Sequence, residues 1–184
     1  ATLEAQIPFL NFFDGFRTSH EVQKVEEISH ETMASLLDPR YIEKFRARAL
    51  RPDAPYAKVG AQNPDVYFQG RETVNKYYDA VPGIVKKYME QVGKATGRSY
   101  RLFDYVGAKD ATKLIIAMGS ACDVVEETVN YLVAKGEKVG AVKVRLYRPF
   151  SVEDLKNVVP QTVKKVAVLD RTKEPGAIGE PLYM

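Results

Sequence analysis

The region from Lys113 to Arg171 constrains the fold most strongly, because patterns typical of buried strands and of helices alternate along it. Three apolar runs have the length of a buried strand: 113–118, 139–146 and 166–169. Residues 121–135 carry apolar side chains at helical spacing, with charged side chains on the opposite face. Ser151 is placed to cap a second short helix, with Asp154 at its third position. This alternation predicts an α/β fold with a small parallel βαβαβ sheet joined by right-handed crossovers.

The N-terminal part begins with Ile7–Phe13, an apolar and aromatic run of strand length that ends in a turn signal at 14–15. Thr18 and Glu21 fit a capping box, which predicts a short helix starting at Thr18. Two further helices are predicted after it, one at 30–37 with Ser29 as its N-cap and one at 40–50. We therefore expect one strand followed by helices in this part of the chain.

Residues 51–70 are rich in proline and glycine and show little periodicity, which predicts an irregular boundary segment. Beyond it, 71–80 and 81–96 read as two helices, or as one helix kinked near Pro82. Eight apolar and tyrosine side chains lie on one helical stripe there: Val74, Tyr77, Tyr78, Val81, Val85, Tyr88, Met89 and Val92. We interpret this stripe as core or domain interface rather than as a platform for stacking bases.

The composition excludes several classes of protein. The chain is 45% hydrophobic and 28% charged, as in ordinary globular proteins, and its net charge of +3 is spread along the sequence, so we expect no nucleic-acid partner. No apolar run approaches ~20 residues, so we expect no membrane partner. Two histidines and the single Cys122 argue against a metal site, a disulfide or a cluster site within the chain. We interpret Cys122 as a buried small residue in a reducing, cytoplasmic setting.

Polar residues cluster just after the first apolar run: Asp14, Arg17, Thr18, His20 and Glu21. Ligands of open α/β sheets bind outside the carboxyl ends of strands, so this cluster is a candidate for one wall of a cofactor crevice. Arg17 would then attract an anion, and His20 would supply a proton or a hydrogen bond. The alternative is a capped loop whose polar groups satisfy the backbone and a neighbouring domain.

Two loops after the later strands are further candidates. Gly119-Ser120 exposes backbone N–H groups at a helix start, which suits an anion, although a simple turn is the alternative because no phosphate motif is present. The loop after the last strand carries four charged residues: Asp170, Arg171, Lys173 and Glu174. It is either a site or a salt-bridged interface loop. Arg148 also follows a strand, before a turn set by Pro149.

Five blocks of the chain resemble the pyruvate:ferredoxin (flavodoxin) oxidoreductase family, in the order in which that family has them. They are Phe12–Glu21 (FFDGFRTSHE), Gln62–Gln69 (QNPDVYFQ), Lys113–Val129 (KLIIAMGSACDVVEETV), Val142–Phe150 (VKVRLYRPF) and Val168–Ala177 (VLDRTKEPGA). Together they cover essentially the whole chain, and five ordered blocks are far more specific than any one alone.

The resemblance implies a large cytoplasmic multidomain enzyme, commonly a homodimer. Such enzymes convert pyruvate and coenzyme A to acetyl-CoA and CO₂, or run the reverse, and exchange electrons with ferredoxin or flavodoxin. Thiamine diphosphate with Mg²⁺ and [4Fe–4S] clusters would serve the full enzyme, with none held wholly by this chain. The resemblance further implies the end of a thiamine-diphosphate-binding-type α/β domain at 1–50, a connector with helices at 51–98 and a transketolase C-terminal-like α/β domain at 99–184.

The chain departs from the family pattern in ways that limit what can be carried over. It lacks the GDG-type diphosphate–magnesium motif and the cluster-binding cysteine runs, and no residue matches the glutamate that activates thiamine. We therefore assign no catalytic residue and no metal ligand. We expect the chain to be an internal segment, inactive alone, because it starts at Ala1 and stops within an apolar run. The Arg148 and 170–174 loops then face neighbouring domains.

Three alternatives remain from the sequence. The first is a related oxidoreductase acting on another 2-oxo acid. The second is a non-catalytic interaction or scaffold module that works through Tyr77, Tyr78, Tyr88 and the 170–176 loop. The third is a stand-alone anion-binding domain that uses Gly119-Ser120.

Overall fold

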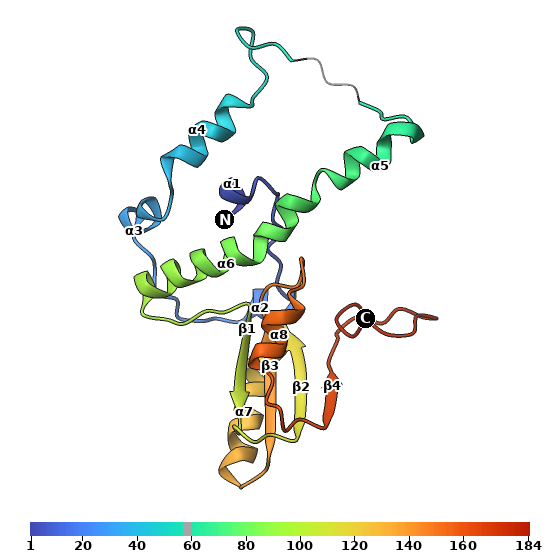
Figure 1. The fold of residues 1–184 in the computed structure, drawn as a ribbon. Coiled ribbons are helices and arrows are strands. Elements are labelled where there is room, and N and C mark those ends of the chain that lie inside the picture. The colour runs from blue at the N-terminus through green and yellow to red at the C-terminus, as the bar shows by residue number, and fades with distance from the viewer. Residues whose placement is uncertain (57–59) are drawn as a thin grey trace. The chain divides into compact units, whose positions relative to one another are not determined.

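The computed structural model describes residues 1–56 and 60–184, and Figure 1 shows their helices and strands. Within those residues no helix combines the length and apolar character that a membrane crossing requires. The chain divides into two compact units, which we call the helical unit and the sheet unit. The helical unit is Ala1–Leu10 with Glu26–Ser99, and the sheet unit is Asn11–Val25 with Tyr100–Met184.

The sheet unit contains one four-stranded sheet in the order β1-β3-β2-β4. Its strands are β1 (Phe103–Gly107), β2 (Lys113–Met118), β3 (Val139–Val144) and β4 (Lys165–Val168). β2 pairs in parallel with β3 and with β4, which confirms the predicted parallel strands. β1 is antiparallel to β3, so the sheet is mixed. The short link from β1 to β2 explains this reversal, because a parallel return needs a crossover of a dozen residues or more.

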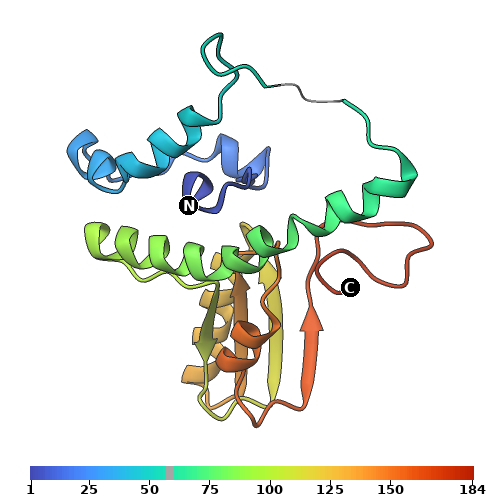
Figure 2. The ribbon, with the colours of Figure 1, turned by 45° about the horizontal axis from the view of Figure 1, so that its top comes forward.

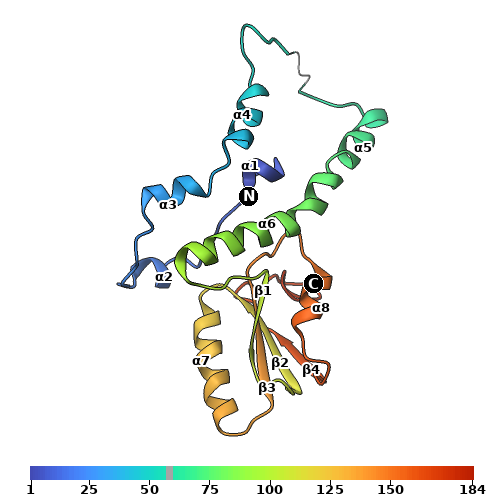
Figure 3. The ribbon, with the colours of Figure 1, turned by 60° about the vertical axis from the view of Figure 1, so that its left-hand side comes forward.

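Two helices cover opposite faces of the sheet, as Figures 2 and 3 show: α7 (Ala121–Ala134) and α8 (Val152–Val158). The chain steps from β2 to its neighbour β3 and then passes back over β2 to β4. Right-handed crossovers in opposite directions place their helices on opposite faces. The carboxyl ends of β2 and β3 therefore form the switch point at which open α/β sheets bind ligands.

Apolar side chains of the central strands form the core of the sheet unit. Leu114 on β2 and Val142 on β3 are 2% and 0% exposed. Phe103 of β1 is buried against Phe150, with ring centroids 5.1 Å apart in an edge-to-face arrangement. The predicted cap of α8 is confirmed, because the Ser151 hydroxyl accepts a hydrogen bond from the Asp154 N–H. Cys122 is buried, as expected, and burial raises the pKa of its thiol.

The helical unit contains five helices among its described residues: α1 (Thr2–Ala5), α3 (His30–Ser35), α4 (Pro39–Ala47), α5 (Pro64–Glu72) and α6 (Asn75–Thr96). α1 packs against α4 and α6. Four side chains are buried there: Ala5, Ile7, Val81 and Val85. α6 runs through Pro82 as one helix and ends at Gly97, whose left-handed backbone closes the last turn. Ser29 caps α3 as predicted by accepting from the Thr32 N–H.

Two predicted elements of the N-terminal half differ from the structure. Ile7–Phe13 is not a strand, because a strand needs a neighbour for its backbone hydrogen bonds and no described segment pairs with it. α5 begins at Pro64, inside the stretch 51–70 that was predicted to be irregular. Proline is well suited to the first position of a helix, where its missing N–H costs no hydrogen bond.

Leu114→Ala tests the central position of β2. We expect this variant to lose about 2–5 kcal/mol of unfolding free energy, because it empties a fully buried site. Leu169→Ala removes the same atoms from a side chain that is 45% exposed and should cost less than about 1.5 kcal/mol. Hydrogen exchange of the β3 amides measures the opening of the sheet itself. Equal losses in the two variants would contradict the described core.

Candidate functional site

The carboxylate of Asp14 contacts two parts of the sheet unit that are distant from it in the sequence. Its Oδ2 accepts a hydrogen bond from the backbone N–H of Ser120 at 2.6 Å. Its Oδ1 lies 3.1 Å from Nη1 of Arg171. The Asp14 side chain is 21% exposed, so it is partly shielded from water. Three segments far apart in the sequence thus meet at one carboxylate: 11–25, the β2–α7 junction and the end of β4.

The sheet topology explains why Ser120 and Arg171 meet. β2 and β4 are parallel neighbours, so the residues that follow them leave the same edge of the sheet. Ser120 is the N-cap residue of the 14-residue α7, where unpaired N–H groups and the helix dipole favour an anion. Arg171 adds a full positive charge at the same place.

Gly119 makes the close approach of Asp14 possible. Its φ of +78° lies in the left-handed region that side chains disfavour. A Cβ at this position would also lie 2.9 Å from Oδ2 of Asp14, which is closer than real Cβ contacts. Both the turn after β2 and the position of the carboxylate therefore require glycine here.

The surroundings of Asp14 favour its ionised form. Hydrogen bonds from Ser120 hold the pKa of this carboxyl below its ordinary value, and the Arg171 guanidinium lowers the pKa further. Partial burial acts in the opposite direction and is outweighed. Gly119-Ser120, for which the sequence left open an anion site or a simple turn, thus contacts an anion supplied by the chain itself.

The other residues of the first cluster lie on or beside α2 (Arg17–His20). Thr18 is not the predicted N-cap, because Phe16 takes a φ of 57° and the helix already begins at Arg17. The Arg17 side chain lies outside the described part of the structure. Nδ1 of His20 lies within hydrogen-bond distance of the Phe16 carbonyl, and Glu21 accepts from Nε2 of Gln23 at 3.2 Å. The contacts described for these two residues are with near neighbours in the sequence.

The charged loop after β4 folds back on the C-terminal residues of the sheet unit. Asp170 accepts a hydrogen bond from the Leu182 N–H at 3.2 Å. Nζ of Lys173 lies 3.3 Å from Oε1 of Glu180, and the Glu174 N–H donates to Oε2 of the same carboxylate at 2.8 Å. These contacts close the loop within one unit. Whether the loop also faces a neighbouring domain stays a prediction.

Arg148 lies on an exposed turn after β3, and its guanidinium is 4.8 Å from the ring centroid of Tyr147. The Tyr147 hydroxyl in turn donates to the Pro181 carbonyl at 2.9 Å. The Arg148–Pro149 peptide bond is cis. The loop after β4 therefore contacts the last residues of the chain directly, and Arg148 is linked to them through Tyr147.

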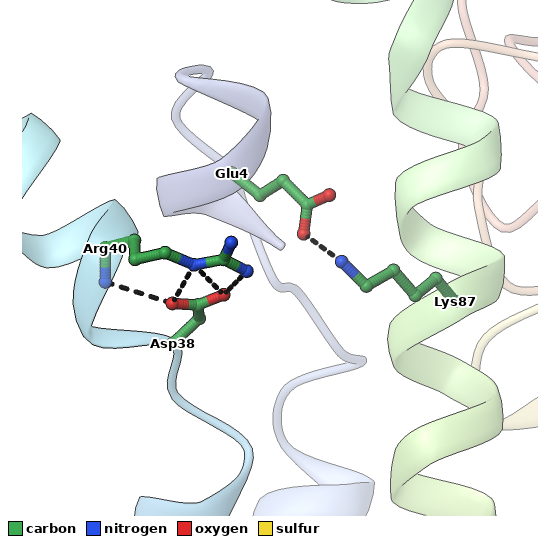
Figure 4. Close-up of polar contacts among 4 residues, drawn as sticks. All are labelled: Glu4, Asp38, Arg40 and Lys87. Carbon is green, nitrogen blue, oxygen red and sulfur yellow. Dashed lines mark hydrogen bonds and ion pairs between the residues drawn. The ribbon is translucent and has the colours of Figure 1, made fainter.

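A second polar cluster, in the helical unit, was not predicted from the sequence (Figure 4). Oε2 of Glu4 on α1 lies 2.7 Å from Nζ of Lys87 on α6. Burial acts to raise the pKa of Glu4, but interactions with Lys87, Tyr88 and Tyr41 outweigh it and hold the pKa below its ordinary value. One carboxylate therefore ties α1 to α4 and to α6.

Figure 4 also shows how α4 begins. The Asp38 carboxylate accepts a hydrogen bond from the Arg40 N–H at 3.0 Å and lies 2.6 Å from Nη2 of the same arginine. Asp38 thus serves as the N-cap of the helix and as the partner of a charged side chain in its first turn. The sequence signal was the pair Asp38-Pro39, an N-cap residue followed by proline at the first helical position.

A groove of about 420 Å³ lies in the sheet unit between α7 and the strands β2, β3 and β4. Apolar side chains dominate its lining, including Ile115, Val125 and Val166. Lys113 and Lys165, the first residues of β2 and β4, also line it. The groove therefore reaches the amino ends of these strands, whereas Asp14 lies at their carboxyl ends. Within residues 1–56 and 60–184, no group of three or more His, Cys, Asp and Glu is placed to hold a metal ion.

Tyr88 provides a test of the Glu4 cluster. Burial and the hydrogen bond to Glu4 raise the pKa of Tyr88 to about 12. A raised pKa means that this tyrosine stabilises the fold fully below pH ~10 and progressively less as the pH rises towards 12. Tyrosinate absorbance is followed in rapid pH jumps for the wild type and for Tyr88→Phe, and the difference between them is the signal of Tyr88. We expect this signal to have its midpoint near pH 12.

Glu4→Gln is the matched control for this titration. It removes the carboxylate and leaves Tyr88 partly buried, so the midpoint should fall part of the way towards the ordinary tyrosine value. A midpoint that does not move in Glu4→Gln would contradict the described cluster.

Comparisons with known proteins cover most of the chain. The family described as "Pyruvate flavodoxin/ferredoxin oxidoreductase, thiamine diP-bdg" matches residues 1–90. The family described as "Pyruvate:ferredoxin oxidoreductase core domain II" matches residues 111–183. Among solved structures, a 2-oxoglutarate:ferredoxin oxidoreductase from Magnetococcus marinus is 24% identical, with a TM-score of 0.44, over 64% of this chain and 19% of that chain.

Curated relatives match the chain along its whole length. The pyruvate:ferredoxin oxidoreductase of Moorella thermoacetica is 63% identical over 183 residues, which are 100% of this chain and 16% of that protein. The pyruvate-flavodoxin oxidoreductase of Klebsiella pneumoniae is 56% identical over 184 residues, again 100% of this chain and 16% of that protein. The chain thus spans 16% of the length of these relatives. It belongs to the pyruvate:ferredoxin/flavodoxin oxidoreductase family.

Proposed function

We propose that residues 1–184 are part of an enzyme that oxidises pyruvate with coenzyme A to acetyl-CoA and CO₂. The reaction releases a proton and two electrons, which pass to ferredoxin or flavodoxin. The observation that carries this proposal is the 63% identity over 100% of the chain to a pyruvate:ferredoxin oxidoreductase. The relatives compared above are named for pyruvate, which favours it over another 2-oxo acid.

Thiamine diphosphate is the cofactor named for the family that matches residues 1–90. When bound, it supplies the electron sink for cleavage of a 2-oxo acid. The described residues bring no three His, Cys, Asp or Glu side chains together to hold a metal ion, and the Asp14 carboxylate is already paired, which supports a site for the Mg²⁺-bound diphosphate outside this chain. We propose that Mg²⁺, the [4Fe–4S] clusters and most cofactor contacts belong to the rest of a longer polypeptide, which acts as a cytoplasmic homodimer.

We also propose that the chain divides into the end of a thiamine-diphosphate-binding-type domain (1–50), a connector (51–98) and a transketolase C-terminal-like domain (99–184). The separate family matches to 1–90 and 111–183 support a change of domain between them. The strands of the sheet unit, which begin at Phe103, support the last of these divisions.

The residues after Phe13 are proposed to border the cofactor crevice: Asp14, Arg17, Thr18, His20 and Glu21. Support comes from Asp14, whose carboxylate lies at the carboxyl ends of β2 and β4, the edge at which α/β sheets bind ligands. Arg148 and the 170–174 loop are proposed to face neighbouring domains. In this role the chain supplies a scaffold and one wall of the crevice, and it does not supply the reacting groups.

An assay of acetyl-CoA formation tests the proposal. The full-length gene product, purified without oxygen, should form acetyl-CoA from pyruvate and coenzyme A while reducing ferredoxin. The 184-residue chain alone, given the same substrates with thiamine diphosphate and Mg²⁺, should form none. Turnover by the isolated chain would contradict the assignment as a part. A full-length enzyme that uses 2-oxoglutarate and rejects pyruvate would contradict the substrate.

A further inference from the structure

The segment Asn11–Val25 belongs to the sheet unit although some 75 residues of the helical unit separate it in sequence from Tyr100. Its connection to the unit is defined at Asp14, whose carboxylate meets the start of α7 and the end of β4. At Asp14 the segment therefore reaches the edge of the sheet from which the loops after β2 and β4 emerge.

Apolar burial does not hold this segment in place. Its large apolar side chains are mostly exposed: Phe12 59%, Phe13 67%, Phe16 83%, Val22 101% and Val25 80%. At about 25 cal/mol per Å² of buried apolar surface, side chains so exposed gain little from folding. The polar contacts of Asp14 are then the main attachment that the described residues provide.

The polar contacts of Asp14 are charge-assisted and therefore stronger than hydrogen bonds between neutral groups. The Asp14 carboxylate is ionised, its bond from the Ser120 N–H measures 2.6 Å, and its second oxygen faces a guanidinium. Charge-assisted hydrogen bonds are about twice as strong as neutral ones. The helix dipole of α7 acts in the same direction. The Asp14 side chain is 21% exposed and the Arg171 side chain 59%, so water screens the ion pair more than the hydrogen bond from Ser120.

We propose that Asp14 is a positioning residue that latches the segment Asn11–Val25 to the carboxyl edge of the sheet. The latch fixes α2, which carries Arg17, Thr18 and His20, in relation to the loops after β2 and β4. The attachment itself is independent of the reaction. Its consequence for turnover rests on the proposed function.

The chain offers variants that separate charge, hydrogen bonding and position. Asp14→Asn keeps an acceptor for the Ser120 N–H and loses the ion pair. Asp14→Ala loses both. Arg171→Gln removes the other half of the ion pair from a different element. Asp123→Asn is the matched control, because Asp123 is an exposed aspartate in the first turn of α7.

Hydrogen exchange of the full-length protein tests the latch directly. We expect peptides from 11–25 to exchange about tenfold faster in Asp14→Ala, with Asp14→Asn and Arg171→Gln intermediate. The double variant Asp14→Asn/Arg171→Gln should be no faster than the more affected single variant, because the two side chains share one interaction. Asp123→Asn should match the wild type. Peptides from β3 should stay protected in every variant, which shows that the sheet remains folded.

Unchanged exchange of 11–25 in Asp14→Ala would overturn the latch, and so would additive effects in the double variant. Turnover then tests positioning. We expect kcat/KM for pyruvate to fall at least about tenfold in Asp14→Ala and less in Asp14→Asn, with Asp123→Asn unaffected. Faster exchange with unchanged kcat/KM would overturn the positioning role. A wild-type protein without pyruvate turnover would overturn the proposed function and leave the exchange result to decide the latch.

Discussion

The fold depends on one constraint: β2 is parallel to both of its neighbours, and parallel strands cannot be joined by a tight turn. Each connection must therefore carry a helix back across the sheet, and α7 and α8 take opposite faces because the two crossovers run in opposite directions. The same constraint gathers the loops after β2, β3 and β4 at one edge. Ser120 and Arg171 lie at that edge because parallel pairing brings the carboxyl ends of neighbouring strands together.

An anion site in a protein can be occupied by a carboxylate of the same chain instead of an external ligand. Glycine at 119 and the start of α7 form a typical place for a phosphate, yet a carboxylate from a segment about one hundred residues earlier in the chain occupies it. Arg171 would suit a phosphate equally well, and here it completes the internal contact. Physical chemistry that is often taken to indicate ligand binding serves instead to attach one segment to another. In the helical unit Glu4 plays a comparable part by joining three helices through Lys87, Tyr41 and Tyr88.

Local sequence patterns predicted most of the helices and strands of the sheet unit. They did not predict contacts between residues far apart in the sequence. β2, α7 and the caps at Ser29 and Ser151 follow from periodicity and from residue preferences that act over one turn. Asp14, Gly119-Ser120 and Arg171 were each singled out, but nothing local shows that they meet, because their contact depends on the strand order. Ile7–Phe13 has the composition of a strand, but no described segment pairs with it, and composition alone does not show whether a strand has a neighbour. No local sequence pattern distinguishes Glu4 from other surface glutamates.

The row of phenylalanines around Asp14 has a consequence for how this protein behaves in solution. Phe12, Phe13 and Phe16 lie on the surface within five residues of one another, and each is more than half exposed. Exposed aromatic side chains so close in sequence favour association with other apolar surfaces. A preparation of the 184 residues by themselves would tend to self-associate, so its apparent size would grow with protein concentration. Its solubility would fall with rising sulfate concentration, because sulfate strengthens apolar association.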